Sequence, residues 1–216
     1  MSYIPNMYVK GNHECFVTRD GNVALEDWQL IGQTNRSNKY IQKSNNSLIY
    51  YFDIRGCRFI VLDSSSNTND GFSDEHESFL QNAFDTIGDK KAIVFTHIPL
   101  DASQMLQATP VNANKLRAIL LANKNKVIAV MHGHTHWDHV TELDGIKYIS
   151  TCCAMCGKLS DSEIAKYTGN GTPAVYDRSY NTYSEYCMDI VVVDTYSNFI
   201  RTFRFGVGDN RVIDCN

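Results

Sequence analysis

Two short, uninterrupted apolar runs flank a helical segment in the middle of the chain. The runs are KKAIVFTHIPL at 90–100 and KVIAVMHGHTH at 126–136, and NANKLRAILLANKN at 112–125 lies between them. Continuous apolar runs bounded by polar residues are typical of strands buried on both faces. Because strand, helix and strand alternate here, the pattern predicts an α/β sheet with parallel strands. The active groups of such a sheet are expected beyond the carboxyl ends of its strands.

Further elements are predicted on both sides of this unit. The segment SLIYYFDIRGCRFIVLDSS at 47–65 is typical of a β-hairpin that turns at Arg55-Gly56. A helix is expected after Ser73, a good N-cap residue followed by acidic residues. Asp144-Gly145 indicates a second hairpin turn. The remaining predictions are a strand at Met7–Lys10, a helix at 24–32, a long loop at 157–186, antiparallel strands within 140–154 and 186–208, and a turn after the last strand at 204–211.

Composition favours one soluble domain. The chain has 216 residues, of which 43% are hydrophobic, so we expect a single domain spanning 1–216. The formal net charge is -4 and no run is rich in Lys or Arg. This argues against an anionic membrane partner, and against nucleic acid except as a substrate. Since no apolar stretch approaches the roughly 18 residues of a membrane span and no secretory leader pattern opens the chain, a cytoplasmic location is expected.

The seven cysteines are irregularly spaced, which argues against a secreted disulfide scaffold. Cys153 and Cys156 have the spacing of half a zinc or redox site, but no second Cys-x-x-Cys accompanies them. The cluster of Cys152, Cys153 and Cys156 lies in an apolar, strand-like run. Because free Cys is among the most buried residue types, buried structural thiols are the favoured interpretation and a site is the alternative.

Groups that can bind a metal ion or transfer a proton follow three predicted strands, in YVKGNHE, IVFTHIP and IAVMHGHTH. An α/β sheet gathers such strand ends into one crevice. Neutral imidazole suits Zn, Fe, Mn or Ni, and an amide oxygen can complete the shell of a hard cation. A lone histidine is more often a satisfied polar residue, but three such strand ends favour a site. Its candidate members are Asn12, His13, Glu14, His97, His134 and His136.

Alternate residues of an extended segment point to the same side, so His134 and His136 are expected to face the crevice together. Gly133 is expected to let the backbone turn and approach a metal or phosphate closely. His132 has the same period, and the sequence leaves open whether it joins the site or packs within the sheet.

Three side chains outside these motifs have two interpretations each. Asp138 and His139 either orient the metal ligands or belong to the polar surface. Arg178 either contacts phosphate from a Tyr-rich loop or lies in a solvent-exposed connection.

GNHE at 11–14, the single His97 in THIP, and GHTH at 133–136 resemble, in this order, the calcineurin-like metallophosphoesterase family. The resemblance covers nearly the whole chain, including the hairpin at 47–65. It implies an α/β fold in which two β-sheets form a sandwich flanked by helices, four layers in all, with a two-metal site at one edge. It also implies a hydrolase whose substrate is a phosphomonoester or phosphodiester.

The resemblance also implies roles for the candidate residues. It assigns one ion to Asn12, His97 and His134, and the second ion to His136. His13 would contact the phosphate and protonate the leaving oxygen, oriented by Glu14. The cofactors would be divalent Mn, Fe or Zn, two in the family, which clamp the phosphoryl oxygens and lower the pKa of a bridging water.

Two motifs that begin the family pattern, Asp-x-His and Gly-Asp-x-x-Asp, have no counterpart here. The ten residues ahead of Gly11 contain no Asp, Glu or His. We therefore expect a domain that lacks its first βα units, roughly 60 residues at the usual size of such units. Since an open catalytic site needs about three protein ligands plus water, one ion or none is expected here instead of two.

Two explanations of the missing motifs stay open: a truncated product of a longer enzyme, which the intact catalytic residues favour, and a natural short form. The rival function is a non-catalytic scaffold or binding module of the same fold. Missing strands would expose a sheet edge, through which a homo-oligomer is expected. A zinc hydrolase of amides or esters is disfavoured, because the chain has neither a His-Glu-x-x-His helix nor a Gly-x-Ser-x-Gly elbow.

Overall fold

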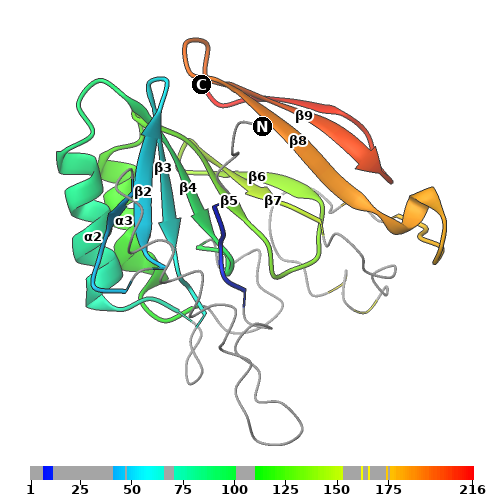
Figure 1. The fold of residues 1–216 in the computed structure, drawn as a ribbon, viewed down its shortest axis with the longest axis horizontal. Helices are drawn as coiled ribbons and strands as arrows, with labels where there is room; N and C mark the ends of the chain where they lie inside the picture. Colours follow the sequence, from blue (N-terminus) through cyan, green and yellow to red (C-terminus); the bar gives the residue numbers. More distant parts are fainter. Residues whose placement is uncertain are drawn as a thin grey trace, which may run out of the picture.

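In this computed structural model, the residues described are 7–11, 41–46, 48–65, 71–100, 110–152, 162, 165, 174 and 176–216. They form two β-sheets, with two helices beside the larger sheet (Figure 1). The helix predicted at 24–32 lies outside the described residues, as does most of the loop predicted at 157–186.

The larger sheet has seven strands in the order β1-β2-β3-β4-β5-β7-β6. Their bounds are β1 (Gln42–Lys43), β2 (Tyr50–Ile54), β3 (Cys57–Leu62), β4 (Lys91–Thr96), β5 (Val127–His132), β6 (His139–Leu143) and β7 (Ile146–Ser150). Four central strands, β3, β4, β5 and β7, run parallel. The remaining strands add antiparallel pairs at both edges. The predicted parallel α/β sheet is therefore confirmed.

Two tight hairpins connect strands of this sheet where the sequence predicts them. Arg55 and Gly56 join β2 to β3 with φ values of 46° and 78°. Asp144 and Gly145 join β6 to β7 with φ values of 57° and 80°. Positive φ at both central residues is the geometry that matches the natural twist of two-residue hairpins.

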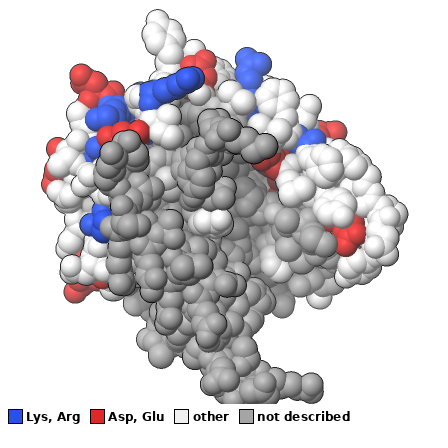
Figure 2. All heavy atoms as spheres, viewed as in Figure 1, with Lys and Arg blue, Asp and Glu red and all other residues white. Residues whose placement is uncertain are grey.

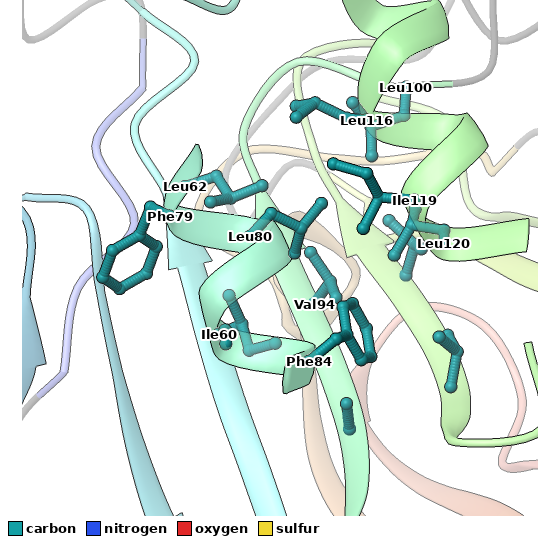
Figure 3. Packing of buried hydrophobic residues seen from close by; sticks show 14 of the residues in the cluster. Ile60, Leu62, Phe79, Leu80, Phe84, Val94, Leu100, Leu116, Ile119 and Leu120 are labelled. Carbon is teal, nitrogen blue, oxygen red and sulfur yellow. The ribbon is translucent and has the colours of Figure 1, made fainter. Parts of the chain in front are cut away.

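The two helices, α2 (Asp74–Asp85) and α3 (Ala113–Ala122), lie side by side against one face of the large sheet (Figure 1). Ser73 caps α2 as predicted, in a capping box whose other member is His76. Figure 3 shows Leu80, Leu116 and Leu120 of the helices directed at Ile60 and Val94 of the sheet. Fully burying one such side chain contributes about 1.5–3 kcal/mol, which explains why the helices pack here.

The smaller sheet consists of β8 (Cys187–Asp194), β9 (Phe199–Gly206) and β10 (Arg211–Asp214) in the order β10-β9-β8. Ile200 and Ile213 of its inner face pack against Ile93 and Met131 of the large sheet. The predicted two-sheet sandwich is confirmed. The prediction that 204–211 follows the last strand is wrong, because the four residues of β10 come after this turn.

The outer face of the small sheet carries exposed apolar side chains. Ile190 is 69% exposed, and its cross-strand partner Phe203 is 49% exposed. The further members of this face are Met188, Val192, Phe205 and Val212. Both α-helices lie against the large sheet, and within the described ranges the helical element at this face is the 3-10 helix η3 (Tyr183–Glu185), whose Tyr183 ring centroid lies 5.1 Å from that of Phe205.

Residues Met7–Lys10 do not form the predicted strand. Instead of pairing with a strand, the backbone of Tyr8 forms hydrogen bonds with the Tyr50 hydroxyl. This hydroxyl accepts a hydrogen bond from Tyr8 N–H at 2.9 Å and donates to the Tyr8 carbonyl at 2.8 Å. Burial raises the pKa of Tyr50 to about 12, against the opposing effect of the backbone hydrogen bond. One side chain thus fixes the segment that leads into GNHE.

Acidic and basic side chains of the described residues are mixed on the face drawn in Figure 2, where blue and red atoms alternate. This agrees with the absence of a Lys/Arg-rich run from the sequence. None of the helices in the described part of the chain is long and apolar enough to cross a membrane.

Candidate metal centre

The carboxyl ends of four parallel strands form one edge of the large sheet. Leu62 of β3 pairs with Thr96 of β4, and His132 of β5 pairs with Ser150 of β7, so the strands end at similar heights. His97 follows β4 directly, and His134 comes two residues after β5. The expectation that strand ends gather these histidines holds for both of them.

His97 and His134 lie against each other. Their ring centroids are 5.3 Å apart at an interplanar angle of 78°, and both residues are half-buried. Gly133 lies beside His97, and its N–H donates to the His97 carbonyl at 3.0 Å. A Cβ atom at Gly133 would lie 3.4 Å from Nδ1 of His97, which is an ordinary van der Waals contact. The left-handed backbone conformations of this turn fall at His134 and His136, not at Gly133.

His97 lines a small cavity of about 250 Å³. His97, Gly133 and Thr151 contribute its polar edge, and Val9 comes to it from the N-terminal segment. The other lining residues are Phe95, Thr96, Met131 and His132. The segment ahead of Asn12 thus reaches the same strand edge as His97.

The prediction that His134 and His136 belong to an extended segment is wrong, because the turn after β5 is not extended. His134 and His136 have φ values of 66° and 59°, in the left-handed region that costs a non-glycine residue about 1–2 kcal/mol. Exposure nevertheless alternates, because Thr135 and Trp137 are buried while both histidines are half-buried. The ring contact is between His97 and His134, while the placement of His136 in the same metal site stays a prediction.

Buried hydrogen bonds hold this turn from behind. The Thr135 hydroxyl lies 3.0 Å from the Ser150 hydroxyl, which donates to the Trp137 carbonyl at 2.9 Å. The Trp137 N–H donates to Thr135 Oγ1 at 3.4 Å. These hydrogen bonds fix Thr135 and Trp137. They offset the backbone strain of His134, which precedes Thr135, and of His136, which lies between the two fixed residues.

Asp138 anchors the end of the same turn to the small sheet. It is 5% exposed, and its carboxylate accepts hydrogen bonds from Arg204 Nη1 at 3.0 Å and from the Tyr176 hydroxyl at 2.5 Å. Arg211 lies 2.7 Å from its other oxygen, and Asp189 pairs with both arginines. Burial acts to raise the pKa of Asp138, but the bonds from Arg204 and Tyr176 outweigh it and hold that pKa below its usual value. The surface interpretation of Asp138 is thus wrong.

The structure also places His132 and Arg178. His132, the last residue of β5, is 2% exposed and lines the cavity beside His97, and its membership of the site stays a prediction. Arg178 donates to the carbonyls of Ser184 and Glu185 and so orders its own loop.

The segment that precedes GNHE is fixed by a buried ion pair. Lys10 Nζ lies 3.0 Å from Asp63 Oδ2, just past β3, and both side chains are less than a tenth exposed. Asn12, His13 and Glu14 themselves lie outside the described residues, so their predicted roles stay predictions.

A family model described as calcineurin-like phosphoesterase matches residues 1–138, well over half of the chain. The chain belongs to this family. The match includes GNHE, His97 and the GHTH turn, so it spans every residue that carries the candidate site.

Among solved structures, this calcineurin-like phosphoesterase is similar to a dimetal phosphatase from Danio rerio, with 12% sequence identity and a TM-score of 0.45. The alignment covers 95% of this chain and 55% of the other, so the chain spans about half of that protein's length. No curated protein matches the sequence.

The family implies divalent metal ions, and the described residues supply part of a ligand set. His97 and His134 offer two adjacent imidazoles, of which His97 lines the cavity, and this pair suits one ion. Within the described ranges, no three His, Cys, Asp or Glu side chains gather into a metal-binding group. A complete shell therefore needs Asn12 or other groups beyond those ranges.

Sequence reasoning missed Thr151 and Val9 at the cavity. Thr151 follows β7, so the strand-end rule that found His97 could also have found it. Val9 carries no chemical signal, and only its position three residues before Asn12 connects it to the motif.

Proposed function

We propose that this calcineurin-like phosphoesterase hydrolyses a phosphomonoester or phosphodiester with the help of divalent Mn, Fe or Zn. The observation that carries the proposal is the contact between His97 and His134 at the carboxyl edge of the large sheet. Two imidazoles from neighbouring strand ends lie in contact, and one of them, His97, lines a cavity. This arrangement suits cation binding better than packing, because packing would favour apolar side chains there.

Asn12, His97 and His134 would hold one ion, and His136 would contribute to a second. Lys10 is tied to Asp63 and Val9 lines the cavity beside His97. Asn12 follows Val9 by three residues, which reach at most about 10 Å. The side-chain amide of Asn12 is therefore expected to reach the two imidazoles. When bound, the ions would polarise the phosphoryl oxygens and supply hydroxide from a bound water.

The protein's own groups would orient the substrate and move a proton. His13 would donate a proton to the leaving oxygen, and Glu14 would hold its ring in the required tautomer. Near its ordinary pKa of about 6.5 an imidazole can both carry and release that proton at neutral pH.

A binding module of the same fold is the second candidate. It is favoured by the incomplete ligand set within the described ranges. The two candidates differ in the step after metal binding, because a binding module would take up the ion without turning over substrate. The single-domain organisation, cytoplasmic location and homo-oligomer predicted from the sequence stay predictions.

The test separates metal binding from hydrolysis. Mn²⁺ binding is measured by calorimetry, and hydrolysis is measured with p-nitrophenyl phosphate and its diester. We expect His97→Ala and His134→Ala to weaken Mn²⁺ binding by at least about 10- to 100-fold and to abolish turnover. We expect His13→Ala to keep Mn²⁺ binding and lose turnover. Glu142→Gln, which changes an exposed carboxylate opposite Lys147 near the other end of β7, is the control and should change neither.

Three results would contradict the proposal. Mn²⁺ binding that is equal in wild type, His97→Ala and His134→Ala would exclude these residues as ligands. Hydrolysis that persists in a chelator would exclude the metal. Normal Mn²⁺ binding with no turnover of either ester would favour the binding module.

A further inference from the structure

Asp63 and Ser64 follow β3 and contact two chain segments that adjoin candidate metal ligands. They are 8% and 0% exposed. Asp63 Oδ2 lies 3.0 Å from Nζ of Lys10, two residues before Asn12. Ser64 Oγ accepts the N–H of the residue after His97 at 2.9 Å. One buried pair of neighbouring residues therefore contacts both the segment that leads into GNHE and the turn that carries His97.

The peptide unit after His97 is fixed at both of its polar atoms. Its carbonyl accepts the Gly133 N–H at 3.0 Å, and its N–H, which belongs to Ile98, donates to Ser64 Oγ. The Thr96 hydroxyl donates to the Ile98 carbonyl at 2.7 Å. Since the imidazole is attached next to this peptide unit, the Ser64 hydroxyl helps to fix the position from which the His97 ring extends.

Both oxygens of the Asp63 carboxylate accept hydrogen bonds within the protein. Oδ2 accepts the Asn46 side-chain N–H at 3.3 Å in addition to the Lys10 ammonium, and Oδ1 accepts the Ser65 N–H at 3.3 Å. Within the described ranges, Asp63 does not belong to a group of three metal-binding side chains. Asp63 therefore acts on the candidate site through Lys10 and not as a ligand of the ion.

The ion pair limits where the GNHE motif can lie. Lys10 is 9% exposed, and Gly11, which is also buried, is the one residue between Lys10 and Asn12. Two residues span at most about 7 Å. Because a charged pair with additional hydrogen bonds fixes one geometry, the place of Asn12 relative to His97 is expected to depend on Asp63.

We propose that Asp63 and Ser64 are positioning residues of the candidate metal centre, which bring Asn12 and His97 to one ion. The proposal rests on the proposed function, because it takes Asn12 and His97 as ligands of that ion. Asp63 acts through the ion pair with Lys10, and Ser64 acts through the peptide unit after His97. Mutation of the groups that orient metal ligands typically weakens metal binding by about 10- to 100-fold.

The test measures Mn²⁺ binding by calorimetry and hydrolysis of p-nitrophenyl phosphate by the purified chain. Asp63→Asn and Lys10→Met each break the ion pair, and Ser64→Ala removes the hydroxyl. We expect each change to weaken Mn²⁺ binding by about 10-fold. Asp53→Asn removes a charge from the pair with Arg58 at the other end of β3, and this control should bind Mn²⁺ as wild type does. Thermal unfolding checks that each variant is folded at the temperature of the measurement.

The two variants of the ion pair separate positioning from an effect of charge alone. Asp63→Asn leaves the positive charge of Lys10 uncompensated, whereas Lys10→Met leaves the negative charge of Asp63. If charge alone acted on the ion, Mn²⁺ binding would weaken in the first variant and strengthen in the second. If the pair positions Asn12, both variants weaken Mn²⁺ binding. Stronger Mn²⁺ binding by Lys10→Met would overturn the positioning role of Asp63.

Double variants assign each positioning residue to its ligand. The effect of Asp63→Asn on Mn²⁺ binding should vanish in Asn12→Ala, where the ligand on which it acts is gone, and should persist in His97→Ala. Ser64→Ala should show the reverse pattern. An effect that persists after its own ligand is removed would show that the residue stabilises the fold without positioning that ligand.

Failure of the positioning role is distinguishable from failure of the proposed function. If Asn12→Ala and His97→Ala weaken Mn²⁺ binding while Asp63→Asn and Ser64→Ala do not, the positioning role alone is excluded. If wild type does not bind Mn²⁺, or if Asn12→Ala and His97→Ala bind it equally well, both proposals fail.

Discussion

The two faces of the large sheet are covered by different means. On one face, α2 and α3 close over a continuous apolar core in which Ile60, Leu80 and Val94 are fully buried. On the other face, the small sheet is joined both by an apolar cluster that includes Ile200 and Met131 and by the buried charges of Asp138 and Arg204 beside the start of β8. Towards the end of β8 the sheets leave an apolar crevice of about 760 Å³.

This difference shows how the molecule stabilises its candidate site. Apolar packing is indifferent to small sliding movements, but paired charges and bidentate hydrogen bonds fix one register. Asp138 directly follows the turn that carries His134 and His136. Its ion pairs therefore fix the part of the interface between the two sheets that lies next to the candidate site.

The largest effect is expected from breaking the charge network. Arg204→Met would leave Asp138 and Asp189 buried with only the half-buried Arg211 between them, and removing one partner of such a buried pair costs about 3–5 kcal/mol. Arg201→Met is the matched control, since Arg201 is exposed on the outer face of the same strand and should cost less than about 0.5 kcal/mol. Urea unfolding monitored by tryptophan fluorescence measures both. A cost below about 1 kcal/mol for Arg204→Met would mean that apolar contacts, and not charges, hold the small sheet.

An intermediate effect compares the two apolar regions directly. Val94→Ala removes two methyl groups from the closed core under the helices and should cost about 2–3 kcal/mol from transfer and cavity terms. Val193→Ala makes the same chemical change at the wall of the crevice (the residue is half-buried) and should cost about 1 kcal/mol or less. Equal losses of unfolding free energy would show that the crevice is closed in solution.

The sequence predicted the core-building elements because their signals are local. The parallel strands around α3, the hairpin at Arg55-Gly56 and the cap at Ser73 all follow from patterns within a few residues. The position of His97 and His134 at one edge follows from the same local signals, since parallel strands have their carboxyl ends on one side.

The rest depends on contacts between residues that are distant in the chain. The left-handed conformations of His134 and His136 are held by Ser150 and by a bond from Asp138 to Arg204, 66 positions away. No local pattern contains that information. Met7–Lys10 has strand propensity, but its backbone partner is the hydroxyl of Tyr50, so tertiary contacts override propensity there.

The smallest effect concerns pH and the closed core. His76 is 7% exposed, its Nδ1 accepts the Ser73 N–H at 3.0 Å, and its Nε2–H donates to the Asp63 carbonyl at 2.6 Å. Burial lowers its pKa below the ordinary 6.5, against the raising effects of Asp63 and Glu75. The folded protein therefore keeps His76 neutral at a pH where the unfolded chain already binds a proton.

The resulting stability is fully present above pH 6.5 and is lost as the pH falls from there towards the lowered pKa of the folded state. We expect the unfolding free energy of wild type to decline between about pH 7.5 and 5.5 by more than that of His76→Gln, with a difference in slope of at most about 1.4 kcal/mol per pH unit. Gln suits this position, because its side-chain oxygen can accept the Ser73 N–H in the capping box. Urea unfolding at both pH values measures the difference, and all other histidines cancel because both proteins contain them. Parallel pH profiles would mean that His76 is solvated in solution. The sheet face under the helices would then differ less from the face under the small sheet than the burial of His76 indicates.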